Sequence, residues 1–348
     1  MEAQGLAPEQ HDSLPEIVEP AENPALVGHQ REAEKLVRAY RNGRLHHALM
    51  LCGPRGIGKA TFAFAIARHL LHNPLASEAP DVLSQPGQDS PVFRQIASGA
   101  HPALLHLTRP LDKDGKKFKT AITVDEIRRV SKFLSMTSHD GSYRIVIVDP
   151  ADDMNTSAAN ALLKNLEEPP NRTLFVLISH APGRLLATIR SRCQIVRLHP
   201  LGNDDLTEVL NALGENAPSD TGQRETLVDL AGGSPRNALL LTRYGGLELT
   251  ETLDKLLESS KLDLEKAYKL ADAVSGRDAD IQFSIVNDAI LDRIAGRARK
   301  MAADGKTAES ARWSNMWYDA SEEIRQTSIF NLDKKQHLVG LISKLHGH

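Results

Sequence analysis

Residues 51–71 read LCGPRGIGKATFAFAIARHLL, and this stretch decides how the rest of the chain is organised. The apolar run Ala48–Cys52 leads into it without alternation, which is typical of a strand buried on both faces of a parallel sheet. After the glycines, Phe62, Ile66 and Leu70 recur at helical spacing. The stretch therefore predicts a strand, a loop and a helix in direct succession.

The loop between this strand and helix has the G-x-x-x-x-G-K pattern of a phosphate-binding loop. In this pattern the glycines let backbone N–H groups curl around phosphate oxygens, and the lysine ammonium reaches the outer phosphates. A glycine-rich turn with no chemical role is the alternative. The predicted nucleotide-contacting residues are Gly53, Pro54, Arg55, Gly56, Ile57, Gly58, Lys59, Ala60 and Thr61.

One position of the loop does not suit a working nucleotidase. The residue after the lysine is normally Ser or Thr, whose hydroxyl holds magnesium, and here it is Ala60. Thr61 cannot replace it, because one step along a helix turns a side chain by about 100°. Whether ATP or ADP occupies the loop stays open at this point.

Length and composition bound the remaining possibilities. At 348 residues the chain has room for two or three domains, and 41% hydrophobic with 25% charged residues is ordinary globular composition. No apolar stretch approaches the roughly 20 residues of a membrane span, and no signal pattern opens the chain, so a cytoplasmic location is expected. Two cysteines predict neither a disulfide framework nor a zinc site. The net charge of −3 argues against a general nucleic-acid binder.

A second buried strand, Tyr143–Val148, ends at Asp149. In phosphate-loop ATPases an Asp at the end of the neighbouring strand orders magnesium, so Asp149 joins the predicted nucleotide site. Hydrolysing members of one large class have a Glu next, which polarises the attacking water, and here Pro150 follows. The displaced Asp152 and Asp153 are expected to cap the next helix.

Strands and helices alternate with short links as far as residue 198, which predicts an α/β fold with a doubly wound parallel sheet. The acidic, proline-containing segment 1–23 is expected to be disordered, and 73–91 to be a long exposed connection. The lysines around the turn Asp114-Gly115 indicate either a solvated hairpin tip or a phosphate contact to DNA.

Three later stretches carry a family likeness. They read AANALLKNLEEPP at 158–170, LLATIRSRC at 185–193 and AGGSPRNA at 231–238. Together they resemble the bacterial clamp-loader branch of the AAA+ proteins, from about Leu26 to Tyr244 and more weakly beyond. The resemblance implies four parts: a disordered tail 1–23, a phosphate-loop domain 24–199, a helical lid 200–245 and a helical collar 246–348 that joins a five-subunit ring.

The same resemblance implies roles for two arginines. The arginine of the Ser191-Arg192-Cys193 motif reaches the ATP bound in the adjacent subunit, where a guanidinium stabilises charge on the transferring phosphoryl group. A surface ion pair is the alternative role for Arg192. Arg236 matches a lid position that approaches the nucleotide in motor subunits, and a lid salt bridge is its alternative role.

The chain departs from the hydrolysing subunits of this branch at Ala60 and Pro150, and it lacks the four zinc-binding cysteines that many relatives carry between Leu71 and Ala100. A subunit without intrinsic ATPase activity, within a DNA polymerase III holoenzyme, is therefore expected. The implied partners are gamma/tau and delta subunits, the sliding clamp and primer-template DNA. An ATP-hydrolysing motor subunit and, more distantly, a small-molecule kinase are the rival functions.

Overall fold

The computed structural model describes residues 6–135, 142–214, 221–259, 261–276, 279–330 and 332–346. The chain forms two compact units, Met1–Arg236 and Asn237–His348, and each is described by itself. None of the helices within these described ranges is both long and apolar enough to cross a membrane.

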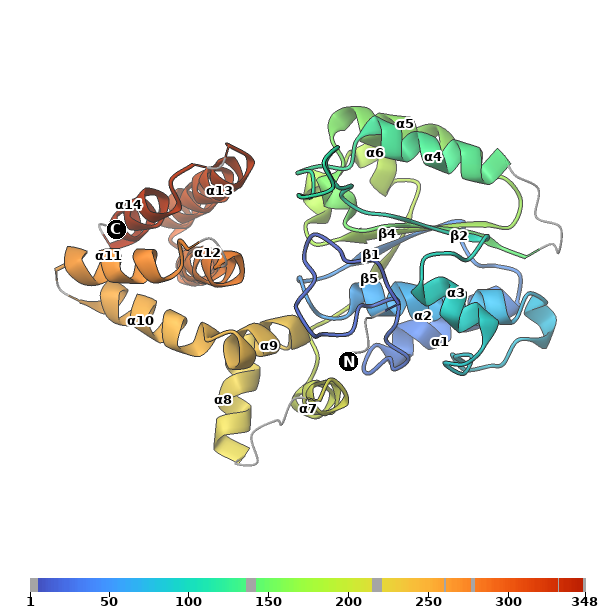
Figure 1. Cartoon of the computed structure of the whole chain (residues 1–348), viewed down its shortest axis with the longest axis horizontal. Coiled ribbons are helices and arrows are strands. Elements are labelled where there is room, and N and C mark those ends of the chain that lie inside the picture. Colours follow the sequence, from blue (N-terminus) through green and yellow to red (C-terminus); the bar gives the residue numbers. More distant parts are fainter. Residues whose placement is uncertain are drawn as a thin grey trace. The chain divides into compact units, whose positions relative to one another are not determined.

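Unit 1 is built on a parallel sheet with strand order β2-β3-β4-β1-β5 (Figure 1). β1 and β4 are buried along their whole length, because helices cover both faces of the sheet. The prediction of a doubly wound parallel sheet is thereby confirmed. The strands are β1 Ala48–Cys52, β2 Leu104–Leu107, β3 Arg144–Val148, β4 Thr173–Ser179 and β5 Gln194–Arg197.

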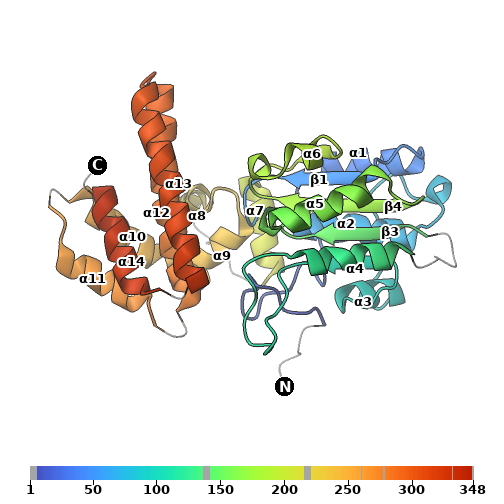
Figure 2. The same cartoon turned by 90° about the horizontal axis from the view of Figure 1, so that it is seen from above.

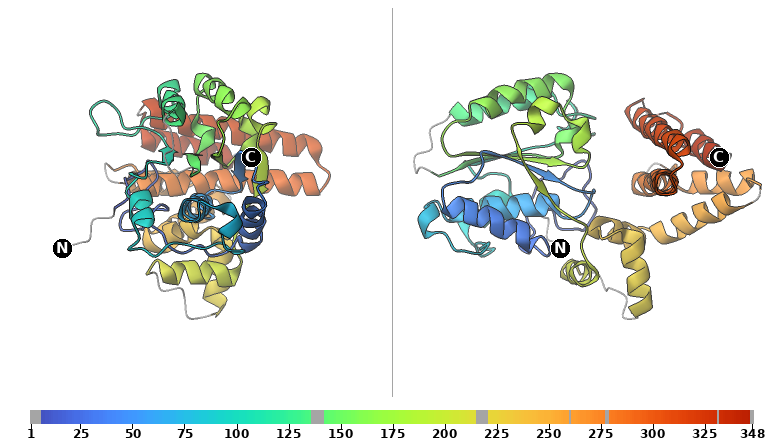
Figure 3. Two further views of the ribbon diagram at one scale, coloured as in Figure 1. Left: turned by 90° about the vertical axis from the view of Figure 1, so that its right-hand side faces the viewer. Right: turned by 180° about the vertical axis from the view of Figure 1, so that it is seen from behind.

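Alternate residues of β1, β3 and β4 enter two separate cores, as the period of two requires. In β1, Leu49 and Leu51 pack toward α1, α2 and α3, whereas Ala48 and Met50 pack toward α4, α5 and α6. Figure 2 shows α4 and α5 lying along the sheet, and the right-hand view of Figure 3 shows helices on both of its sides. These helices are α1 Gln30–Arg41, α2 Lys59–His72, α3 Pro91–Ala97, α4 Val124–Ser135, α5 Thr156–Glu167 and α6 Ala187–Arg190, with 3-10 turns η1 Ala76–Glu78, η2 Ala151–Asp153 and η3 Pro182–Arg184.

The chain beyond the sheet is helical, as predicted. α7 Asn203–Ala212 and α8 Thr221–Ala231 belong to unit 1, and α9 Pro235–Arg243 contains the point of division between the units. The predicted lid 200–245 is thus shared between the two units. Unit 2 has its own apolar core, which includes Leu253, Val286, Ile290, Leu338 and Ile342. Its remaining helices are α10 Gly246–Glu258, α11 Leu264–Ala273, α12 Asp280–Ala303, α13 Thr307–Phe330 and α14 Lys334–His346.

Of two expectations about irregular segments, one is wrong and the other is right only in part. Residues 6–23 are not a detached tail, because Leu14 and Ala21 are buried. The segment buries little by itself, but it packs on a domain that is already folded, so it needs no core of its own. The connection after α2 is also more than an exposed loop, since it contains η1 and buries Ala79 before α3 begins.

Candidate functional site: the phosphate loop and Arg192

The loop Gly53–Lys59 joins the carboxyl end of β1 to the first turn of α2, as the sequence predicts. Two of its glycines are required by the backbone. Gly58 precedes α2 with a φ of 95°, in the left-handed region that glycine tolerates. Gly56 has a φ of 75°, and a Cβ there would lie 2.5 Å from Arg236 Cβ and Ser234 Oγ. The loop therefore requires glycine at both positions, and Ser234 and Arg236 pack closely against Gly56.

The Lys59 side chain is directed back into its own loop. Its Nζ donates hydrogen bonds to the carbonyl oxygen of Gly53, at 2.8 Å, and to that of Pro54. The residue is only 3% exposed, and burial lowers the pKa of Lys59 to about 8 despite the nearby carboxylates of Asp149 and Asp152. The ammonium that would hold a phosphate thus satisfies loop carbonyls in this structure.

Residues from two other parts of unit 1 fix the loop. Ser234 Oγ donates to the Arg55 carbonyl oxygen at 3.1 Å, and the Arg236 amide donates to that of Gly56 at 3.4 Å. The backbone of Arg236 therefore lies beside the loop. His29 Nε2 lies 2.9 Å from the Ile57 carbonyl oxygen. Sequence reasoning missed this histidine, because its only local signal is a Gly-His pair before a helix.

Asp149 ends β3 and lies close enough to Lys59 for their charges to interact. Burial, together with the negative charge of Asp12, raises the pKa of Asp149 to about 7, and Lys59 opposes this rise. Pro150 follows at the position where the water-polarising carboxylate is missing. The strand end therefore carries a carboxyl group that burial biases toward its protonated form.

The prediction that Asp152 and Asp153 cap α5 is wrong. Asn155 caps that helix, because its Oδ1 accepts from the Ala158 amide at 2.8 Å. Asp152 instead accepts from Ser179 Oγ at 2.8 Å and from the amides of His180 and Ala181, which ties η2 to the end of β4. Asp153 accepts from Arg109. Both carboxylates thus make contacts with residues distant in the sequence, which a local sequence pattern cannot predict.

Replacing Asp149 by Asn should change how stability depends on pH. Because folding raises the pKa of Asp149, the folded state binds more protons than the unfolded state between pH 4 and 7. This carboxyl therefore favours folding at pH 4 and loses that effect as pH rises to 7. The denaturation midpoint of Asp149→Asn relative to wild type should rise between pH 5 and pH 7.5, measured by circular dichroism. The variant Asp89→Asn, at a 99% exposed side chain, should show no such change.

Arg192 and the phosphate loop lie at opposite ends of the parallel strands. β5 runs parallel to β1, with Leu49 beside Gln194 and Cys52 beside Arg197. Arg192 therefore precedes the amino end of β5, whereas the loop follows the carboxyl end of β1. The four residue steps from Gln194 to Leu198 alone span about 13 Å of strand. The chain does not bring Arg192 to its own loop.

Arg192 has partners within the chain. Its Nη2 lies 2.7 Å from Glu167 Oε1, and its Nη1 donates to the Thr188 carbonyl oxygen at 2.9 Å. The arginine side chain is 35% exposed and the glutamate 48%, so solvent screens this ion pair. Such a pair contributes at most about 1 kcal/mol, so the guanidinium can exchange it for a stronger anion.

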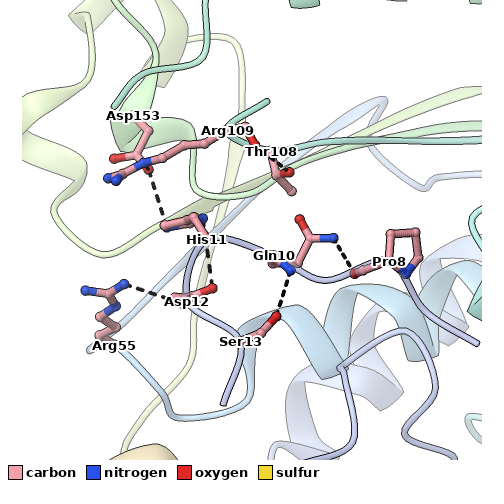
Figure 4. A network of polar contacts seen from close by, with 9 residues as sticks. All are labelled: Pro8, Gln10, His11, Asp12, Ser13, Arg55, Thr108, Arg109 and Asp153. Atoms are coloured by element: carbon pink, nitrogen blue, oxygen red, sulfur yellow. Dashed lines mark hydrogen bonds and ion pairs between the residues drawn. The ribbon is translucent and has the colours of Figure 1, made fainter. Parts of the chain in front are cut away.

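The N-terminal segment lies beside Arg55 of the loop, a contact that the sequence did not predict. Arg55 Nη2 lies 3.3 Å from Asp12 Oδ2, and His11 Nε2 lies 3.9 Å from Asp153 Oδ2 (Figure 4). Arg109 donates to the same Asp153 oxygen at 2.5 Å. Within the described residues, no cluster of three His, Cys, Asp or Glu side chains could hold a metal ion.

Comparison with known proteins places this site in a family. The family model described as DNA polymerase III, delta subunit, matches residues 28–202, which is half of the chain and includes both the loop and Arg192. The chain belongs to the DNA polymerase III delta-subunit family. Similarity to individual proteins agrees with this membership.

Two relatives of this delta-family chain are named DNA polymerase III subunit delta'. The protein from Pseudomonas aeruginosa is 36% identical over 61% of this chain and 62% of its own length. The protein from Escherichia coli is 34% identical over 65% of this chain and 64% of its own length. The match thus spans less than two thirds of either relative.

The delta-family chain is also similar to subunits with other names. DNA polymerase III subunit tau from Salmonella typhimurium is 26% identical over 76% of this chain and 40% of its own length. Among solved structures, a gamma subunit-related protein from Thermotoga maritima shares 17% identity, with a TM-score of 0.41 over 92% of this chain and 99% of that one. This structural similarity is weak and adds nothing about function.

Proposed function

We propose that this chain is a delta-prime-type clamp-loader subunit that acts as a stator, a fixed wall that presents Arg192 to the ATP site of a neighbouring subunit. In that position the guanidinium would stabilise charge on the phosphoryl group transferred during hydrolysis. The observation that carries the proposal is the placement of Arg192 at the edge of the sheet opposite its own phosphate loop. An arginine there serves a nucleotide bound by another chain.

The composition of its own site supports a subunit that does not hydrolyse ATP. Ala60 offers no hydroxyl to magnesium, and Pro150 offers no carboxylate to the attacking water. Gly53–Lys59, with Asp149 and Arg236 beside it, would hold ATP or ADP weakly and unhydrolysed. The function proposed is thus interaction within an enzyme assembly.

The proposal includes partners. The family membership and the similarity to tau favour gamma/tau subunits as the direct neighbours. A delta subunit, the sliding clamp and primer-template DNA would complete the assembly, which loads the clamp during replication in the cytoplasm. The helices of unit 2 would serve as the collar that holds the ring.

The rival function is an ATP-hydrolysing motor subunit, which the intact Gly58-Lys59 pair and the similarity to tau favour. Its expected signature is ATP turnover by the isolated chain. The stator proposal expects turnover of the isolated chain no higher than that of its Lys59→Ala variant, because each missing catalytic group typically contributes about 100-fold.

In the assembly reconstituted with gamma/tau and delta subunits, Lys59→Ala in this chain should change clamp- and DNA-stimulated ATP turnover by less than about twofold. The reason is that the hydrolysed ATP is bound by the neighbouring subunits. A large loss with Lys59→Ala, together with an unaffected Arg192→Ala variant, would instead make this chain a motor.

A further inference from the structure

Residues 6–23, which we name the N-terminal strap, lie against the phosphate loop. Figure 4 shows His11 and Asp12 of the strap between Arg55 of the loop and the pair formed by Arg109 and Asp153. The His11 side chain is only 9% exposed, and its ring meets the edge of Phe118 with centroids 6.5 Å apart. The strap is therefore packed into this position.

Asp12 brings a negative charge to the loop. Its Oδ2 lies 3.3 Å from Arg55 Nη2. Burial alone would raise the pKa of Asp12, but His11 and the guanidiniums of Arg236 and Arg55 outweigh it and hold the pKa below its usual value. Asp12 therefore forms an ion pair with Arg55 of the loop. A nucleotide phosphate would seek the same guanidinium.

The other end of the strap is held by the helix that the loop opens. Arg68 of α2 is fully buried and donates to the carbonyl oxygens of Ala21, at 2.9 Å, and Asn23, at 2.8 Å. The strap is thus fixed to the loop through Asp12 and to α2 through Arg68. Lys59 is meanwhile occupied by the carbonyls of Gly53 and Pro54.

We propose that the N-terminal strap is an intramolecular competitor of nucleotide: Asp12 occupies Arg55, and a nucleoside di- or triphosphate binds the loop only when the strap is released. The strap then lowers the apparent affinity by the fraction of molecules in which it is open. This inference goes beyond the stator role, because it concerns ligand binding by the isolated chain and does not depend on Arg192.

The first test measures how a fluorescent ATP analogue binds to the full-length isolated chain. Asp12→Ala should bind about five- to tenfold more tightly than wild type, because Arg55 is released. Glu9→Ala removes the same charge from an exposed position of the strap and should bind like wild type. Adding Lys59→Ala to Asp12→Ala should reverse the gain, which would locate the ligand in the loop. Equal affinity of wild type and Asp12→Ala, or no binding by any variant at millimolar analogue, would refute the competition.

The second test asks directly whether nucleotide displaces the strap. Hydrogen exchange of the wild-type chain should become several-fold faster across residues 6–23 when ATP is added. Nucleotide that protects Gly53–Lys59 while leaving exchange of 6–23 unchanged would show that strap and nucleotide bind together. That result would refute the proposal without touching the role proposed for Arg192.

Discussion

ATP turnover by the reconstituted clamp loader should fall by at least about 100-fold when Arg192 of this subunit is replaced by alanine and hydrolysis at the adjacent site is followed. A guanidinium directed at a transferring phosphoryl group offsets charge that develops only in the transition state, so its removal lowers the rate more than ATP binding. The measurement is the single-turnover rate at that site in the presence of clamp and primed DNA.

Two variants distinguish this role from a loss of folding or of surface charge. Arg192→Lys keeps the positive charge but loses the planar fork of donors, so it should restore only a minor part of the rate. Arg184→Ala removes an arginine from an exposed position in η3 of the same unit and should leave turnover within about twofold of wild type. Near-wild-type turnover of Arg192→Ala in a complete assembly would contradict the stator proposal.

The largest effect on stability is expected for Arg68→Met. The Arg68 guanidinium donates to Gln85 Oε1 at 2.6 Å and to the carbonyl oxygens of Ala21 and Asn23, and it lies 5.2 Å from the Phe93 ring centroid. Burial lowers its pKa to about 10, so the group remains charged at neutral pH. Methionine fills much of the space but leaves these acceptors unpaired, which should lower the free energy of unfolding of unit 1 by about 3–5 kcal/mol.

Denaturant unfolding followed by far-ultraviolet circular dichroism would measure this loss. Fluorescence is unsuitable, because both tryptophans, Trp313 and Trp317, belong to unit 2. Arg94→Met is the matched control: its side chain is 63% exposed, its ion pair with Asp89 faces solvent, and it should cost less than about 1 kcal/mol. A loss for Arg68→Met no larger than for this control would show that the guanidinium contributes little to the attachment of residues 6–23 and 79–97.

The strands were predictable because burial leaves a local signature. A continuous apolar run placed β1 at Ala48–Cys52, which agrees with the structure. The run at 143–148 gave β3 to within one residue. In each case the side chains of consecutive residues enter opposite cores of the same sheet, so the whole run must be apolar.

The rest of the site depends on contacts between distant residues. Arg68 and Ala21 are 47 positions apart, and Asp12 and Arg55 are 43. Periodicity within a short window contains no information about such pairs, so the prediction that the acidic segment 1–23 is disordered is wrong for residues 6–23. The role of Asp152 was missed for the same reason, because its acceptors serve residues 179–181. The loop and Arg192 could be found, since each lies within a compact motif.

In the proposed assembly, the position of the loop and Arg192 at opposite ends of the strands also sets the direction in which chains join. There, a contact from Arg192 of one chain to the phosphate loop of the next uses two different surfaces, so a series of such contacts is heterologous. Chains joined in this way point in one direction, and each assembly has a first and a last member. A member that offers Arg192 but lacks a hydrolytic site of its own is suited to one end of the series. It can complete its neighbour's active site without needing an arginine from a further chain.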